Sequence, residues 1–444
     1  MAILVEKARL RRILTLALPI MAGMASQNVM NMVDTAMVGT LGNAALAAVG
    51  LGGFTTFMCQ AAVLGVSAGV QATAARRKGE GREAVMAHPL NAGLLIAILL
   101  GALLSVLFYP LMPWLFSHLS SDAQVVAGGT AYVQVRVLAT LFVGVNFAFR
   151  GYWNAVDRSR IYMITMIIMH GCNILLNYVL IFGKLGAPAL GVQGAGMATA
   201  LATVIGSLTF CLLGWRHARP HGFLQGLPSL TEVRRLAALS LPVGMQNLFI
   251  FAGFTMLYWI IGQVGTAELA VATVLINLML LGYLPAIGLG MSAATLVGQA
   301  LGRKDAADAA RWGWDVVKVA TAILLLIGAP MWLAPVLLVS GFIHDAATLE
   351  LAILPMRVAG ATIAVEGISV VLMSGLQGAG DTRRTMVVAA TFQWLLFLPL
   401  AYLIGPVLGY GLLAIWSLQG VYRALLASVY MVLWRQGGWA AIKV

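Results

Sequence analysis

Long apolar runs, separated by short polar segments, dominate this chain of 444 residues. A membrane-spanning helix needs about 20 largely apolar residues. Spanning strands are excluded, because the strands of a membrane barrel alternate between apolar and polar positions. The pattern therefore predicts an all-α integral membrane protein. Its twelve predicted transmembrane helices are 13–38, 46–75, 90–116, 126–150, 161–183, 191–215, 236–262, 269–300, 316–343, 348–377, 385–408 and 411–434.

Composition supports a membrane protein over a soluble one. Only 9% of the residues are charged and the mean hydropathy is +0.93, whereas soluble domains are about 25% charged. The three cysteines, Cys59, Cys172 and Cys211, all fall in apolar runs. Their placement favours packing and offers neither a disulfide framework nor a metal site.

The net charge is +12, and the Lys and Arg residues that produce it are unevenly distributed along the chain. The two ends and the loops after every second predicted helix hold 23 of the 27, the opposite loops hold only Lys184, and three lie within helices. Because cytoplasmic loops are enriched in Lys and Arg, both termini are expected in the cytoplasm, with the chain crossing the inner membrane. This distribution explains the charge without nucleic acid, and the basic start at 7–12 is not interpreted as a signal peptide because the following apolar run is too long.

The two halves of the chain resemble each other. Leu18-Pro19 matches Leu241-Pro242 at an offset of 223, and Arg136 matches Arg357 at 221. Six helices per half predict two six-helix bundles related by a pseudo-twofold axis along the membrane normal. We expect an N-lobe at 1–215, a cytoplasmic linker at 216–235 and a C-lobe at 236–444. Such paired bundles are typical of secondary transporters that work by alternating access.

No motif for an enzyme or a primary pump is visible. Gly183-Lys184 is followed by Leu185, so it is not a Walker A motif. No Ser/His/Asp set offers a nucleophile, and no His/Cys cluster offers a metal site. We therefore predict a protein that is not an enzyme, has no catalytic residue, cofactor or bound metal, and moves its solute with an ion gradient.

Two carboxylates lie inside predicted helices, one in each half. Asp34 interrupts the otherwise uncharged stretch 13–71, and Glu366 lies in the tenth predicted helix. An acid at the bilayer centre costs about 2.5–3.5 kcal/mol on insertion scales, so it marks a proton or cation site by default. A structural acid bonded to a neighbouring hydroxyl is the alternative for Asp34. Glu366 could instead extend its side chain to the membrane surface.

The fifth predicted helix carries two amides four residues apart, Asn173 and Asn177. Residues at this spacing share one helix face, where they could orient Asp34, hold the solute or join two helices. His170 lies on the same helix, and packing is the more frequent role of a lone histidine.

Other charged positions favour structural roles. The repeat-matched Arg136 and Arg357 are expected to pair with helix-end carbonyls or lipid headgroups. Asp157 and Asp381 are expected to cap helices and form ion pairs in loops. Methionines and aromatic residues could line an adaptable binding cleft, although the sequence does not say which of them face it.

Three motifs together resemble the multidrug and toxic compound extrusion (MATE) family. The first is 17–20 followed by Val33-Asp34-Thr35-Ala36-Met37-Val38-Gly39. The second is 183–188 with 191–200, which includes Thr199, and the third is Gly375-Leu376-Gln377-Gly378-Ala379-Gly380-Asp381-Thr382. The resemblance covers nearly the whole chain and implies export of organic cations in exchange for H⁺ or Na⁺.

The resemblance also implies roles for particular residues. Asp34 matches the family's N-lobe acid, and Asn173 matches an amide one turn before a second N-lobe acid, whose place is taken here by Asn177. Glu366 matches an acid of the C-lobe cation site in the Na⁺-driven branch, and the Glu that accompanies it there falls on Ile250. With one acid per lobe, proton coupling through Asp34 is favoured over Na⁺. The predicted ion-coupling or substrate site comprises Asp34, Glu366, Asn173, Asn177 and Thr199.

The predicted function is thus a monomeric antiporter that exports cationic or amphipathic drugs or metabolites across the bilayer, with protonation of Asp34. The alternative is a flippase for lipid-linked precursors, which would need a cationic cleft for phosphate headgroups. A receptor or scaffold without transport is disfavoured, since it gives no reason for buried acids in both halves.

Overall fold

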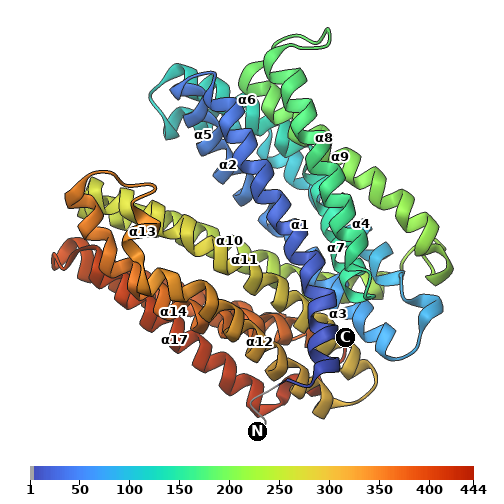
Figure 1. The fold of residues 1–444 in the computed structure, drawn as a ribbon. Helices are drawn as coiled ribbons and strands as arrows, with labels where there is room; N and C mark the ends of the chain where they lie inside the picture. Colours follow the sequence, from blue (N-terminus) through green and yellow to red (C-terminus); the bar gives the residue numbers. More distant parts are fainter. Residues whose placement is uncertain (1–4) are drawn as a thin grey trace. The chain divides into compact units, whose positions relative to one another are not determined.

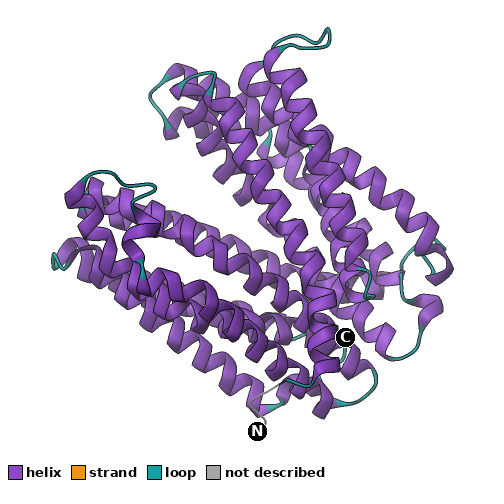
Figure 2. Cartoon of the chain, viewed as in Figure 1, coloured by secondary structure: helices purple, strands orange, loops and turns teal. Residues whose placement is uncertain are grey.

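The computed structural model describes residues 5–444, and every regular element among them is a helix (Figures 1 and 2). Eleven helices are long and apolar enough to cross a membrane, and a bent helix pair at 123–155 brings the number to twelve. The predicted all-α class and the count of spans are therefore confirmed within this part of the chain.

The first half holds six spans and several shorter pieces. Its elements are α1 (Lys7–Gly39), α2 (Asn43–Leu64), α3 (Val66–Gly79), η1 (Glu83–Val85), α4 (His88–Phe108), α5 (Met112–Leu119), α6 (Ala123–Leu138), α7 (Thr140–Ala155), α8 (Ser159–Phe182), α9 (Gly191–His217) and η2 (Arg219–His221).

The second half follows the same order. Its elements are α10 (Leu230–Val264), α11 (Thr266–Gly302), α12 (Ala306–Leu333), α13 (Pro335–Val339), α14 (Ala346–Ala379), α15 (Thr382–Thr391), the π-helical turns η3 (Phe392–Phe397) and η4 (Leu403–Val407) on either side of α16 (Leu398–Tyr402), α17 (Gly411–Gln436) and η5 (Gly438–Ala441).

The helix boundaries repeat with the offset expected from the sequence. Lys7 begins α1 and Leu230 begins α10, at the same offset that separates Pro19 from Pro242. The segment formed by α2 and α3 runs from Asn43 to Gly79, and α11 runs from Thr266 to Gly302, with this offset at both ends. The internal repeat is therefore visible in the elements themselves.

The chain divides into two compact units. The N-terminal unit is Ala22–Leu248, and the C-terminal unit combines residues up to Met21 with Phe249–Val444. In the N-terminal unit α7 packs against α3 and α4, and in the C-terminal unit α14 packs against α11, α12 and α17. These boundaries differ from the predicted lobes in α1 and α10, each of which begins in one unit and ends in the other.

The beginning of α1 belongs to the C-terminal unit because of a charged cluster. Arg9 contacts Asp308 at 2.7 Å and Asp315 at 2.5 Å, both on α12. The guanidinium also lies 3.6 Å from the centre of the Trp312 ring. Two ion pairs and one stacking contact fix a single arginine, so they attach the first turns of α1 to α12.

The beginning of α10 is attached to the N-terminal unit by different chemistry. Glu232 accepts a 2.7 Å bond from Arg77 at the end of α3. Close backbone approach follows along the helices, since a Cβ on Gly65 would lie 2.2 Å from the carbonyl oxygen of Ser240. Small residues permit such approach between membrane helices.

One predicted helix is broken. The expected span 126–150 is formed by α6 and α7, which meet at Ala139 with a bend of 50°. Neither proline nor glycine lies at the break. Side chains of other helices bind the freed carbonyls instead: Gln60 donates to Arg136 O at 3.3 Å and Ser105 donates to Val137 O at 2.6 Å. Side-chain insertion into the backbone ladder is a known cause of kinks.

We expect Gly378→Ala to destabilise the C-terminal unit. A Cβ at this position of α14 would lie 2.4 Å from the carbonyl oxygen of Ala294 on α11, so the two helices would have to move apart. Overpacking of this kind costs about 1–3 kcal/mol, and thermal unfolding in detergent should register it. The matched control is Gly262→Ala, whose Cβ would meet only Leu269 at 3.8 Å. An unchanged melting temperature for Gly378→Ala would contradict the close packing of α11 and α14.

Candidate functional site

Asp34 lies on α1 and is held by an amide from α8. Asn177 donates its side-chain N–H to Asp34 Oδ1. Asn173, one turn earlier, is equally buried, and its amide nitrogen lies 2.8 Å from the same oxygen when its carbonyl faces Thr199. The spacing of four residues therefore places both amides beside one carboxylate.

Thr199 completes this cluster from α9. Its hydroxyl lies 3.2 Å from the side chain of Asn173 and donates to Ala195 O at 3.0 Å. Three helices, α1, α8 and α9, thus bring together four of the five predicted site residues. We call this group, Asp34, Asn173, Asn177 and Thr199, the amide cluster.

The second carboxylate oxygen of Asp34 differs from the first. Oδ1 receives the amide contacts, while Oδ2 receives no hydrogen bond from the residues that the structure describes. The residue is partly exposed, so Oδ2 is the atom at which a proton or a cation could be added.

Arg136 lies near this acid, and among the described residues its guanidinium forms no hydrogen bond to a helix-end carbonyl, contrary to expectation. Its guanidinium donates to Tyr132 OH at 2.7 Å, and its charge acts on Asp34. No ion pair within 4.0 Å joins the two among the described residues. Arg136 therefore contributes positive potential to the amide cluster without neutralising its carboxylate directly.

Glu366, the fifth predicted residue, lies in the C-terminal unit and has a charged partner. It is 6% exposed on α14, and Arg423 of α17 contacts its Oε1 at 3.1 Å. Tyr283, Tyr422 and Tyr430 surround the pair closely enough to interact with Arg423 electrostatically. Glu366 is therefore a buried, ion-paired carboxylate, and its side chain does not extend to the surface.

Sequence reasoning missed Arg423 as the partner of Glu366. The signal was present, since Arg423 falls in the middle of a predicted span and a charge within the membrane pairs with another charge or a carbonyl. Ile250, where the second C-lobe acid of some MATE proteins would fall, lies on α10, and its carbonyl accepts a 3.4 Å bond from Gln393. In this chain the carboxylate on α14 is accompanied by an arginine on α17. Position 250 carries no second acid.

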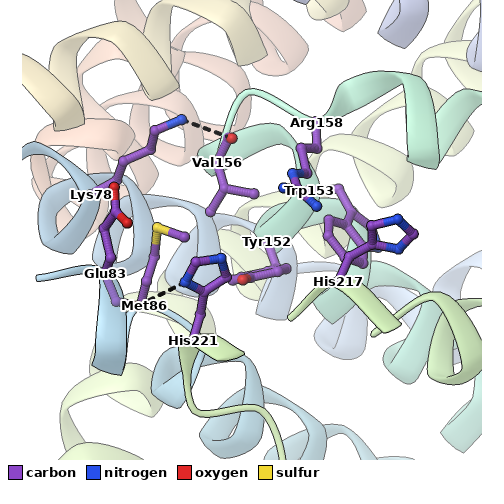
Figure 3. Close-up of a pocket in the computed structure, with 9 residues that line it drawn as sticks. All are labelled: Lys78, Glu83, Met86, Tyr152, Trp153, Val156, Arg158, His217 and His221. Carbon is purple, nitrogen blue, oxygen red and sulfur yellow. Dashed lines mark hydrogen bonds between the residues drawn. The ribbon is translucent and has the colours of Figure 1, made fainter. Parts of the chain in front are cut away.

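A separate pocket of about 200 Å³ lies in the N-terminal unit, between the ends of α3, α7 and α9 (Figure 3). Two of its polar side chains are engaged: Lys78 donates to Val156 O at 2.8 Å and contacts Asp157, and His221 bonds Glu83 O at 3.1 Å. The expected ion pair of Asp157 is thus present. None of the predicted site residues lines this pocket, so we do not assign the transported solute to it.

Among the described residues, no group of three His, Cys, Asp or Glu side chains is placed to hold a metal ion. The fold and the site together define a polytopic helical membrane protein, built from a repeat. One compact unit holds Asp34 among amides, and the other holds Glu366 paired with Arg423. Two related halves of this kind are typical of secondary transporters.

Comparison with known proteins identifies the family. The MatE family model matches residues 19–179 and 242–403, and the two matches start at Pro19 and at its repeat counterpart Pro242. The chain belongs to the MatE family, as its motifs suggested.

Similar proteins cover nearly the whole chain. A probable multidrug resistance protein NorM from Synechococcus is 28% identical over 96% of this chain and 93% of its own length. The multidrug resistance protein NorM of Burkholderia vietnamiensis is 27% identical over 95% and 92%.

Solved structures support the fold. An outward-facing multidrug resistance MATE family transporter of the MOP superfamily has a TM-score of 0.87 at 21% identity, covering 97% of this chain and 96% of its own. A MOP superfamily transporter from Pyrococcus furiosus, described as having a binding pocket of reverse polarity, has a TM-score of 0.86 at 22% identity, covering 96% and 95%.

Proposed function

We propose that this protein is an antiporter that exports cationic or amphipathic drugs or metabolites in exchange for protons, with Asp34 as the proton carrier. The names of its relatives support the substrate class, since they are multidrug resistance proteins. The acids Asp34 and Glu366 support ion coupling, because a carboxylate within a membrane-spanning helix marks a proton or cation site by default.

The observation that carries the proposal is the contrast between the two acids. Asp34 is held by neutral amides and keeps Oδ2 open. Protonation there removes a charge without leaving a buried cation unpaired. Protonation of Glu366 would leave Arg423 buried without its counter-ion, and breaking a buried pair in this way is strongly unfavourable. Asp34 is therefore the acid that can load and release a proton at small cost.

The same contacts favour H⁺ over Na⁺. Hard cations prefer several oxygen ligands, but both amides at Asp34 present N–H groups to Oδ1. At Glu366 the guanidinium of Arg423 already occupies the cation's place. A proton needs only one carboxylate oxygen, and Oδ2 provides it.

The remaining features of the proposal follow from the charge distribution and the family. The protein works in the inner membrane with both termini in the cytoplasm, as a monomer and without a cofactor, and it is not an enzyme. A flippase for lipid-linked precursors would need free cations for a phosphate group. Because Arg423 is paired with Glu366, it is not free to bind a phosphate group. This pairing favours cationic substrates.

The test is ethidium efflux from proteoliposomes under an imposed pH gradient or an imposed Na⁺ gradient. We expect the pH gradient alone to drive efflux, with nigericin abolishing it. Efflux driven by Na⁺ at equal pH would refute proton coupling. Movement of a phosphate-headgroup lipid without ethidium transport would favour the flippase.

A further inference from the structure

His170 forms a second polar cluster between the helices that build the amide cluster. The ring is 3% exposed on α8. Its Nδ1 lies 2.8 Å from Ser26 Oγ and its Nε2 lies 3.1 Å from Gln27 Oε1, both on α1. His170 precedes Asn177 by seven residues and Gln27 precedes Asp34 by seven, so about 10 Å of helix separates the clusters.

The contact with Gln27 determines that Nε2 of the His170 ring carries a proton. The amide nitrogen of Gln27 donates to Asn31 Oδ1 at 3.2 Å, which turns its oxygen toward the ring. An amide oxygen only accepts hydrogen bonds. The Nε2 atom of His170 therefore carries a hydrogen and donates it to Gln27.

The hydroxyl of Ser26 can donate its hydrogen bond in either of two directions. Ser26 Oγ lies 2.8 Å from Gly23 O and also 2.8 Å from Nδ1 of the ring. A hydroxyl has one proton to donate. When it donates to the ring, Nδ1 is bare and the imidazole is neutral. When it donates to Gly23 O, its lone pair faces the ring and Nδ1 must carry a second proton.

We propose that His170 is a second proton-binding site of the N-terminal unit, in which rotation of the Ser26 hydroxyl between Nδ1 and Gly23 O accommodates the neutral and the protonated ring. Binding adds one proton at Nδ1 and breaks no covalent bond. The proposal rests on the proton coupling proposed above and deepens it, because it gives the exporter a second group able to hold a proton.

The charges around the ring decide when the proton is held. Burial favours the neutral ring. Asp34 on α1, Arg136 on α6 and Arg150 on α7 are charged groups within the spans of this unit. An ionised Asp34 attracts a proton to His170, whereas the two arginines repel it. The other ionisable side chains there are Tyr152, Tyr162, Tyr178, Cys172 and Cys211, and none of them bonds the ring. Protonation of His170 is thus expected to depend on whether Asp34 is ionised.

The test is ¹⁵N NMR of the full-length protein in nanodiscs, with labelled histidine rings. His170→Gln assigns the His170 signal by its loss, and His118→Gln on the exposed α5 serves as the matched control. On acidification we expect the His170 signal to convert reversibly to the imidazolium form while the protein stays folded. In Ser26→Ala, which removes the acceptor for a protonated Nδ1, the midpoint should move to lower pH.

Two results would overturn the proposal. One is a ring that stays neutral down to the pH at which the protein unfolds, and the other is a midpoint that is the same in Ser26→Ala. Neither result would contradict the proposed function, which is tested separately by gradient-driven efflux. Transport offers a further distinction: the amide of His170→Gln can still donate to Gln27 as Nε2 does, so a packing role predicts an unchanged pH profile of efflux. A proton-binding role predicts a less steep one.

Discussion

Asp34→Asn is expected to reduce pH-gradient-driven ethidium efflux to the level of protein-free liposomes. Asparagine has nearly the same shape and can still accept the N–H of Asn177, but it cannot take up a proton at Oδ2. The variant should fold, because the amide cluster then loses a charge and keeps its contacts. Exchange of labelled for unlabelled ethidium, which needs no proton, should continue.

Asp122→Asn is the matched control for this change. Asp122 is an exposed acid of the same unit that caps α6 by accepting from the backbone N–H of Gln124. Asparagine is an equally good capping residue, so efflux should be unaffected. If Asp34→Asn still accumulated a gradient of ethidium, proton carriage would have to be assigned to another group, and the contrast between Asp34 and Glu366 would no longer support the proposal.

Arg423→Gln is expected to cause the largest loss of stability. The substitution leaves Glu366 as a buried charge without its partner, and removal of one member of a buried pair costs about 3–5 kcal/mol. The double variant Glu366→Gln with Arg423→Gln replaces the pair by two neutral amides and should recover most of this loss. Thermal unfolding in detergent, followed by tryptophan fluorescence, provides the measurement.

The control for Arg423 is an arginine that pairs at the surface. Arg82 lies 3.4 Å from Glu80, and their side chains are 58% and 33% exposed. Such pairs contribute about 0–1 kcal/mol, so Arg82→Gln should melt close to wild type. Equal melting temperatures for the single and double variants at 366 and 423 would show that the pair does not couple. The double variant should also keep pH-driven efflux, since Asp34 is intact.

Much of the N-terminal site could be predicted from local spacing. The interval of four residues between Asn173 and Asn177 fixes a shared helix face whatever the tertiary structure. The constant offset between Leu18-Pro19 and Leu241-Pro242 predicted the repeat of helix boundaries, because equivalent sequences make equivalent helices. These features depend on the helical period and on self-similarity, which a single sequence contains in full.

Features that depend on tertiary contact could not be predicted in the same way. The break at Ala139 has no Pro or Gly to announce it and depends on Gln60 and Ser105 from two other helices. The choice of Arg423 as partner of Glu366 depends on how α14 packs against α17. The assignment of the start of α1 to the C-terminal unit depends on Arg9 meeting two carboxylates of α12, far away along the chain.

The central claim is that protons and drug move in opposite directions through Asp34. The most direct measurement is the internal pH of proteoliposomes, read with pyranine, after an ethidium gradient is imposed at equal pH with the membrane potential clamped. We predict that ethidium entry drives protons out of wild-type vesicles and that Asp34→Asn gives no pH change. Ethidium movement without proton movement in wild type, or the same pH change in the variant, would contradict this account.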